Sequence, residues 1–156
     1  MGVDRFRTAL NAYKVIGLDA MSFIYHFEKK PHFGPITKAL FAHIQAGKAS
    51  AVISVLVAGE VLTGVKKAGN QEMILRYRHI FGTLPHLVVR DANMRVMEKM
   101  SDLRAAYGLK TPDAIHVATA LLNGAQAFVT NDAGLKRVNE LDVLVLEDYV
   151  ERRNKC

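Results

Sequence analysis

Four acidic residues, spaced widely along the chain, could together carry metal chemistry: Asp19, Glu60, Asp113 and Asp132. Each belongs to a different predicted strand or helix unit, so folding could bring all four to one point. Carboxylates a few ångströms apart cannot all ionise without a cation. A ligand set made only of oxygen atoms suits Mg²⁺ or Mn²⁺, which keep water ligands and accept phosphate oxygens.

Taken singly, three of these acids also have a local explanation. Asp19 and Asp132 could each cap a helix or form an Asx-turn, and the helix dipole favours Asp113 beside Pro112. Glu60 differs, because it lies more than one turn inside a predicted helix in an otherwise apolar stretch. A buried glutamate without a partner is costly, so we expect something to neutralise it. The four residues together favour a metal site.

Short apolar runs alternate with helical patterns along most of the chain. Strands are predicted at residues 15–18, 51–55, 87–90, 126–130 and 143–146. Helices are predicted at residues 36–46, 56–68 and 71–81, from a cap at Asp91 to about residue 107, and from Thr111-Pro112 onward. Strands alternating with helices predict a single α/β domain, with a mainly parallel sheet covered by helices on both faces.

The predicted sheet explains how the acids could meet. In open parallel sheets, functional groups collect beyond the carboxyl ends of the strands. Asp19 follows the first strand directly, and Asp132 lies two positions past Thr130. Glu60 is reached through the helix after the second strand, and Asp113 lies in the first turn of its helix. All four can therefore face the same edge.

Length and composition indicate one domain of 156 residues, with a core at about residues 15–146 between a short N-terminal and a basic C-terminal extension. No apolar run could cross a bilayer, and residues 1–14 do not resemble a secretory signal. The single cysteine, Cys156, fits a cytoplasmic protein without disulfides. The net charge is +6, which suits a nucleic-acid partner but equally an ordinary basic protein.

Other chemistries do not match the sequence. Residues 64–69 have the glycine spacing of a phosphate-binding loop, but Asn70 and Gln71 replace the required Lys and Ser/Thr. No nucleophile elbow and no paired-His zinc helix occur. The segment that starts at Asp19 lacks the second Asp of an aspartyl-phosphate phosphatase.

Five further residues near the acids could contact substrate. His116, one turn beyond Asp113, could touch substrate or a water, although a hydrogen-bonded core histidine is the more common role. Basic residues that follow the acidic positions could hold phosphates, and a solvated helix face explains them equally well. These are Lys66, Lys67, Lys136 and Arg137.

Together these segments resemble the PIN-domain family, in particular the VapC-type toxins of toxin–antitoxin pairs, over about residues 15–146. The matching blocks are Leu18-Asp19-Ala20-Met21-Ser22-Phe23-Ile24-Tyr25, Ser54 with Glu60-Val61-Leu62, Leu109-Lys110-Thr111-Pro112-Asp113-Ala114-Ile115-His116-Val117-Ala118-Thr119-Ala120 and Phe128-Val129-Thr130-Asn131-Asp132. The resemblance implies a five-stranded parallel sheet, Mg²⁺ or Mn²⁺ dependence, homodimers, cleavage of single-stranded RNA and a small antitoxin partner.

By that resemblance Asp19, Glu60, Asp113 and Asp132 are the catalytic metal ligands. Thr130, Asn131 and Ser22 would orient carboxylates or waters around them. The sequence departs from the family pattern at three positions that support these ligands, namely Ala20, Met21 and Val57, where polar residues are frequent.

The sequence thus predicts a metal-dependent endoribonuclease, a hydrolase of RNA phosphodiester bonds that acts as the toxin of a toxin–antitoxin pair. Two alternatives stay open at this point. One is a housekeeping PIN nuclease of RNA maturation, and the other is a non-catalytic PIN scaffold whose acidic pocket receives a basic partner.

Overall fold

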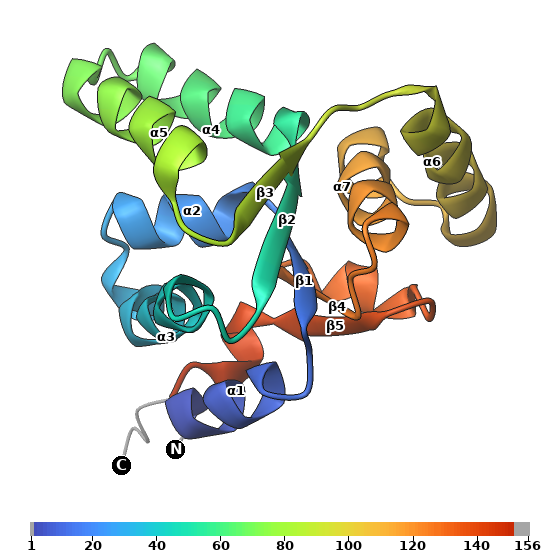
Figure 1. The fold of residues 1–156 in the computed structure, drawn as a ribbon, viewed down its shortest axis with the longest axis horizontal. Coiled ribbons are helices and arrows are strands. Elements are labelled where there is room, and N and C mark those ends of the chain that lie inside the picture. The colour runs from blue at the N-terminus through green and yellow to red at the C-terminus, as the bar shows by residue number, and fades with distance from the viewer. Residues whose placement is uncertain (1, 152–156) are drawn as a thin grey trace.

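The computed structural model describes residues 2–151, in which five parallel strands form one sheet between two layers of helices (Figure 1). The strands are β1 (Val15–Leu18), β2 (Ser50–Ser54), β3 (Leu87–Arg90), β4 (Ala127–Thr130) and β5 (Asp142–Val145). Every neighbouring pair is parallel, in the order β3-β2-β1-β4-β5. The predicted α/β fold and its five strands are confirmed.

Helices connect β1 to β2, β2 to β3 and β3 to β4, and they cover the sheet. They are α1 (Gly2–Leu10), α2 (Ala20–Phe27), α3 (Gly34–Gln45), α4 (Val55–Lys67), α5 (Gln71–Thr83), α6 (Met94–Tyr107) and α7 (Thr111–Leu122). The described residues also form three short 3₁₀ turns: η1 (Pro31–Phe33) between α2 and α3, η2 (Ala133–Arg137) between β4 and β5, and η3 (Leu146–Tyr149) after β5. None of the helices within residues 2–151 has the length and hydropathy needed to cross a bilayer.

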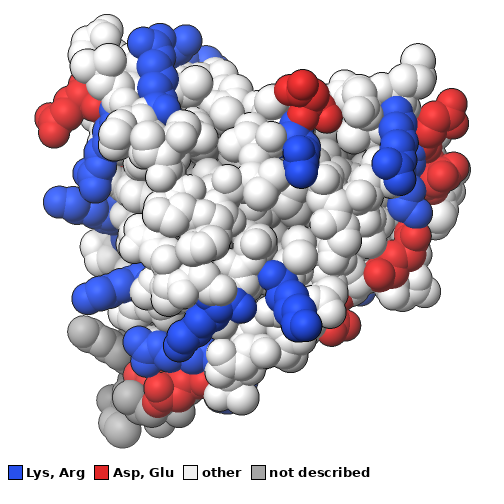
Figure 2. Space-filling view, viewed as in Figure 1, with Lys and Arg blue, Asp and Glu red and all other residues white. Residues whose placement is uncertain are grey.

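The order of the strands creates a switch point at β1. Strands β1, β2 and β3 follow one another toward one edge of the sheet, and the chain then returns to place β4 and β5 on the other side of β1. Connections therefore diverge between the carboxyl ends of β1 and β4, where open α/β sheets bind their ligands. On this side the surface is notched between α4–α5 and α6–α7 (Figure 2).

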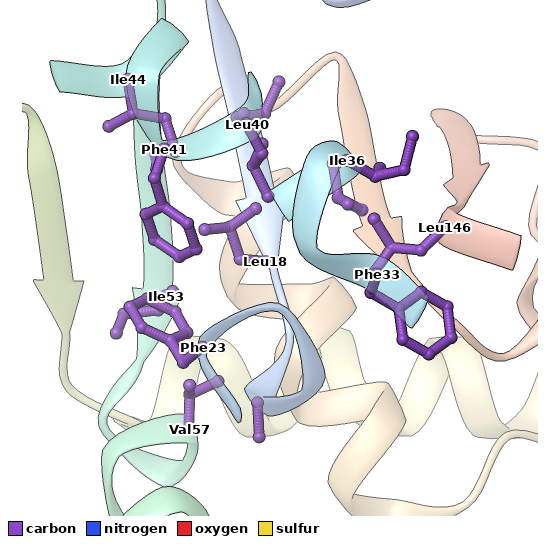
Figure 3. Packing of buried hydrophobic residues seen from close by; sticks show 14 of the residues in the cluster. Leu18, Phe23, Phe33, Ile36, Leu40, Phe41, Ile44, Ile53, Val57 and Leu146 are labelled. Carbon is purple, nitrogen blue, oxygen red and sulfur yellow. The ribbon is translucent and has the colours of Figure 1, made fainter. Parts of the chain in front are cut away.

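Separate apolar cores fill the two faces of the sheet. On one face, β1 and β2 pack with α2 and α3, where Leu18, Ile53, Phe23 and Phe41 converge (Figure 3). On the other face, α7 packs against β1 and β2 and is covered by α6. Neighbouring residues of one strand enter opposite cores, so the three central strands β2, β1 and β4 are buried on both sides, as is usual in parallel sheets.

Gly17 allows α7 to lie close to β1. A Cβ atom at this position would stand 2.5 Å from the Cβ of Ala120 and 2.8 Å from Cδ2 of Phe128. Real atoms do not approach so closely, so any side chain here would push α7 or β4 outward. The missing side chain thus allows the helix that carries Asp113 to lie against the strand that leads to Asp19.

Two features at the element ends differ from the sequence prediction. The predicted core of residues 15–146 omits α1, whose Phe6 and Leu10 are fully buried against the rest of the fold. Asn93, rather than Asp91, caps α6 by accepting a hydrogen bond from the backbone N–H of Val96. The basic C-terminal extension, from residue 152 on, lies outside the described residues.

Candidate metal centre

A cleft of about 350 Å³ opens beyond the carboxyl ends of the strands, close to the switch point. Its walls contain all four predicted carboxylates, together with Ala20, Met21, Tyr25, His116 and Asn131. The acids come from four separate segments of the chain, as the sequence predicts. Hereafter this space, lined by Asp19, Glu60, Asp113 and Asp132, is called the acidic cleft.

Asp19 is the most buried of these carboxylates, with 8% of its surface exposed. It directly follows β1 and caps α2, because its Oδ1 accepts a 3.1 Å hydrogen bond from the N–H of Met21. Its Oδ2 accepts a 2.6 Å hydrogen bond from the hydroxyl of Thr130 at the end of β4. Both carboxylate oxygens therefore accept hydrogen bonds, one from the first turn of α2 and one from the end of β4.

Burial raises the pKa of Asp19 from 3.8 to about 6. The hydrogen bonds from Thr130 and Met21 lower this pKa, but they do not offset the loss of solvation. The negative charges of Asp113 and Glu60 raise it further, which places those carboxylates within electrostatic range. A cation in the cleft would offset both the cost of burying the Asp19 charge and the repulsion between the carboxylates.

Asp113 and Asp132 form the opposite side of the cleft. Asp113 lies in the first turn of α7 and is half-buried, and its pKa is raised by burial and by the charge of Asp132. Asp132 is exposed and caps η2 by accepting a 2.8 Å hydrogen bond from the N–H of Gly134. The predicted capping role is therefore real for Asp132, and it coexists with a place in the acidic cleft.

Glu60 is not buried, contrary to the sequence expectation, since 41% of its side chain is exposed. Its helix turns this residue toward the open mouth of the cleft, whereas the preceding Val57 points into the core. Its hydrogen-bond partner is His116, whose Nε2 lies 2.6 Å from Oε1 of Glu60. Solvent and this histidine explain how a carboxylate is accommodated there.

His116 is nearly fully buried on α7 and lines the cleft. Burial lowers its pKa, so the imidazole is neutral and donates from Nε2 to the carboxylate of Glu60. Its Nδ1 has no hydrogen-bond partner among the described residues. The residue is thus a core histidine that also orients one of the acids.

The predicted supporting residues behave differently from one another. Thr130 contacts Asp19 as expected, and its hydroxyl also accepts the N–H of Asp132 at 3.1 Å. Asn131 does not contact the acids: its Nδ2 donates to the hydroxyl of Tyr25 at 3.2 Å, and its Oδ1 accepts the N–H of Glu147. The hydroxyl of Ser22 is buried without a partner among residues 2–151.

Tyr25 lines the acidic cleft, but it is not among the site residues predicted from the sequence. It lies on α2, six positions after Asp19, and its ring stacks on Phe33 with centroids 4.0 Å apart. The sequence signal for this residue was its type and position: a tyrosine, aromatic with a polar hydroxyl, on the helix that Asp19 caps. Its hydrogen-bond partner, Asn131, is 106 positions away and leaves no trace in local sequence.

The basic residues proposed from sequence do not line the acidic cleft. Lys136 pairs with Asp148, and Arg137 donates to the carbonyl oxygen of Gly108. Lys66 and Lys67 are exposed in the last turn of α4. The structure therefore brings the four acids and His116 together and leaves these four cations outside.

The donor set fits a hydrated divalent cation. Within residues 2–151, no three His, Cys, Asp or Glu side chains are close enough to enclose an ion by themselves. Mg²⁺ commonly takes only one or two protein carboxylates and completes its coordination with water. Four carboxylates around one cleft, one of them buried with a raised pKa, match that mode of binding.

A model of the PIN domain family matches residues 16–141, which covers most of the chain and all four acids. The chain belongs to the PIN-domain family. No curated protein matches it in sequence. The PIN-domain assignment therefore rests on the family model and is consistent with the fold.

Solved structures with a similar fold come from bacterial protein complexes. A chain of VapBC2 from Rickettsia felis, bound to a promoter DNA fragment, has a TM-score of 0.67 and 20% identity and covers 84% of this chain and 98% of its own. A toxin–antitoxin complex from Klebsiella pneumoniae has a TM-score of 0.64, 23% identity and coverage of 85% and 97%. DNA-bound VapBC from Salmonella typhimurium has a TM-score of 0.65, 19% identity and coverage of 85% and 98%. At these identities the likeness shows the fold.

Proposed function

We propose that this PIN-domain protein is a Mg²⁺- or Mn²⁺-dependent endoribonuclease that hydrolyses phosphodiester bonds of single-stranded RNA. One observation carries the proposal: Asp19, Glu60, Asp113 and Asp132, from four separate segments, line one cleft at the switch point of the sheet. Such a concentration of carboxylates has little structural benefit without a cation. Phosphate esters are the substrates that such cations commonly bind.

Asp19 and Asp113 would hold the cation centrally, with Glu60 and Asp132 completing the site. One or two such ions supply activation of a water molecule and neutralisation of charge on the phosphate and the leaving oxygen. The chain itself positions the ligands. Thr130 directs Oδ2 of Asp19, and neutral His116 directs Oε1 of Glu60. Both donors are buried, so their hydrogen bonds are protected from competition by water.

The proposal extends to partners. The similar solved structures are toxin–antitoxin complexes, which supports a small antitoxin as the partner of this chain and a toxin role for its nuclease activity. A guanidinium inserted between Asp19 and Asp113 could bridge both carboxylates and displace the cation. We also propose a homodimer, in line with the family resemblance.

The decisive experiment is cleavage of a labelled single-stranded RNA by purified protein, with Mg²⁺, Mn²⁺ or excess EDTA. We expect cleavage only with a divalent cation, and loss of cleavage in Asp19→Asn and Asp113→Asn. Asp102→Asn is the matched control, because Asp102 is an exposed acid on α6 away from the cleft. Equal rates for Asp19→Asn and Asp102→Asn would refute the assignment of Asp19.

Co-expression separates the toxin from the alternatives. Induction of the wild-type gene alone should slow growth, and co-expression of the adjacent gene should restore it and yield a stable complex. RNA cleavage without growth arrest would favour a housekeeping nuclease. Retained RNA binding without cleavage under any metal condition would favour a non-catalytic scaffold.

A further inference from the structure

A second pocket, of about 610 Å³, lies beside the acidic cleft and is not explained by the metal chemistry. It is formed by the end of α2, the turn η1 and α3 along its length, from Gly34 to Gln45. Its walls include Tyr25, His26, Lys29, Lys30, Lys38 and Phe41. We call it the lysine pocket. Its volume is within the range of sites that hold small organic groups.

The charge of the lysine pocket is opposite to that of the acidic cleft. Lys29, Lys30 and Lys38 are exposed at its rim, and none of the described residues that line it is acidic. Within residues 2–151 these lysines take part in no ion pair. On the face drawn in Figure 2, basic side chains lie along the edge where α2 and α3 are, with acidic side chains above and below them on the same side. Such a rim attracts phosphate groups.

Aromatic rings line the interior of the lysine pocket. His26 stacks on Phe41 with centroids 4.7 Å apart and an interplanar angle of 27°. Tyr25 stacks on Phe33 in a nearly parallel arrangement. Phe33 and Phe41 are buried, so each supports a partly exposed ring at the pocket wall from behind. Nucleic-acid bases bind such surfaces by stacking, with little dependence on base identity.

Lys29 occupies a backbone conformation that favours glycine. Its φ is +54°, and the N–H groups of Lys29 and Lys30 bond to the carbonyl oxygens of His26 and Tyr25. This is the Schellman arrangement that ends many helices, with glycine as the usual residue at the left-handed position. A lysine here is less favourable for the backbone, and strain of this kind persists most often where a side chain has a function. In this conformation Lys29 lines the lysine pocket.

Tyr25 connects the two sites, because it lines both the acidic cleft and the lysine pocket. Asn131, at the end of β4, donates to its hydroxyl, and Phe33 covers its ring. The tyrosine is therefore a fixed wall between a site for a cation and a site for an anion. A polymer that carries one phosphate per unit would pass from one side of this wall to the other.

We propose that the lysine pocket binds a nucleotide of the RNA strand adjacent to the bond that is cut. Its phosphate contacts the ammonium groups of Lys29, Lys30 and Lys38, and its base packs against the His26 and Tyr25 rings. This proposal rests on the proposed nuclease function, whose substrate it extends beyond the acidic cleft. In this arrangement the RNA strand crosses Tyr25 and does not follow the exposed Lys66 and Lys67 on α4.

The test compares two double variants that remove the same charge. Lys29→Gly with Lys38→Ala removes two of the three lysines at the pocket rim, and Lys14→Ala with Arg95→Ala removes two exposed cations that line neither the lysine pocket nor the acidic cleft. The first variant should fold well, because glycine suits the left-handed position and alanine suits the interior of α3. Thermal melting of both variants verifies this.

Binding is measured by fluorescence anisotropy with a labelled single-stranded RNA in EDTA, so that no cleavage occurs. We expect the pocket variant to bind RNA about 10-fold more weakly or worse. The slope of log K against log salt should fall by roughly 1.4, since each lost phosphate contact on a single strand contributes about 0.7. The control variant should match wild type. Equal changes in the two variants, or none in either, would overturn the proposal.

A second arm uses wild-type protein and changes the RNA. Single abasic positions are placed along a substrate with a known cut site, and an abasic position next to the cut should weaken binding more than any distant one. Uniform effects at all positions would contradict a base-binding pocket.

An error in the assignment of the lysine pocket and an error in the proposed nuclease function give different results. If wild-type protein neither binds nor cuts RNA, the proposed function fails and this inference fails with it. If wild type cuts RNA and the pocket variant behaves as the control does, only the pocket assignment is wrong. If the pocket variant binds RNA normally but loses its complex with the adjacent gene product, the lysine pocket receives a protein partner instead.

Discussion

The hydroxyl of Thr130 donates a 2.6 Å hydrogen bond to Oδ2 of Asp19 and joins the carboxyl ends of β1 and β4. The pairing of Leu18 with Val129 in the preceding register step places the two residues side by side. The same hydroxyl oxygen accepts the N–H of Asp132 at 3.1 Å. One buried hydroxyl thus orients one carboxylate of the acidic cleft and the segment that carries a second.

Thr130→Val keeps the shape of this side chain and removes the hydroxyl. Because the hydrogen bond favours ionised Asp19, its loss should raise the pKa of Asp19 above about 6. We expect cleavage at pH 7 to fall by roughly 10- to 100-fold. The acid limb of the pH–rate profile should move to higher pH, and Thr130→Ser should restore it. A slower enzyme with an unmoved acid limb would argue against this role.

Asp19→Asn should increase the stability of the metal-free protein at neutral pH. The folded-state pKa of Asp19, about 6, exceeds its ordinary value of 3.8. Stability contributed by the protonated carboxyl is therefore present below about pH 4 and is lost as pH rises through 6. Urea unfolding in EDTA at pH 8 should show a gain of up to roughly 3 kcal/mol in the variant. The gain should disappear near pH 4, and Asp102→Asn should show none.

Divalent cations should reverse this order of stabilities. A cation that binds only the native state stabilises it by about 2.7 kcal/mol at about one hundred times its dissociation constant. The melting temperature of wild type should therefore rise with millimolar Mg²⁺ or Mn²⁺. The double variant Asp19→Asn, Asp113→Asn should show no such rise. An equal rise in both proteins would mean that the cation binds elsewhere.

His116 is expected to position Glu60 rather than act on substrate. His116→Leu fills the buried site without a donor, whereas His116→Gln keeps an N–H near the place of Nε2. We expect the leucine variant to lose roughly 10- to 100-fold in Mn²⁺ affinity, measured by calorimetry, and the glutamine variant to recover much of it. Equal affinities for the leucine variant and wild type would leave His116 with a packing role alone.

Gly17→Ala should loosen the contact between α7 and β1. The added methyl group has no room beside Ala120 and Phe128, and overpacking of this kind costs about 1–3 kcal/mol or more. Since α7 carries Asp113, cleavage should fall together with the free energy of unfolding. Gly64→Ala, on α4 with open space around it, should instead add about 0.5–1 kcal/mol. A tolerated Gly17→Ala would show that α7 can shift without harm to the site.

Local patterns in the sequence were sufficient for the five strands, for helices α3 to α7 and for the candidate acids, whereas α1 and α2 were not predicted. The apolar run before Asp19 predicts β1, and Pro112 with Asp113 marks the start of α7, because both signals lie within a few residues of the feature they determine. The PIN resemblance rests on the same short blocks. The position of each acid at the carboxyl end of a strand or in the first turns of a helix follows from these local signals.

Only the tertiary structure decided how those acids are partnered. Glu60 reads as a buried residue because its neighbours are apolar, yet the packing of α4 turns it outward onto His116, 56 positions away. Asn131 is hydrogen-bonded to Tyr25 instead of to a carboxylate of the acidic cleft, and Lys136 forms an ion pair with Asp148. Likewise, α1 enters the core because Phe6 meets Tyr149 from the far end of the chain. Such contacts depend on the crossover that returns β4 beside β1, and no local pattern of residues encodes which distant side chain that crossover brings near.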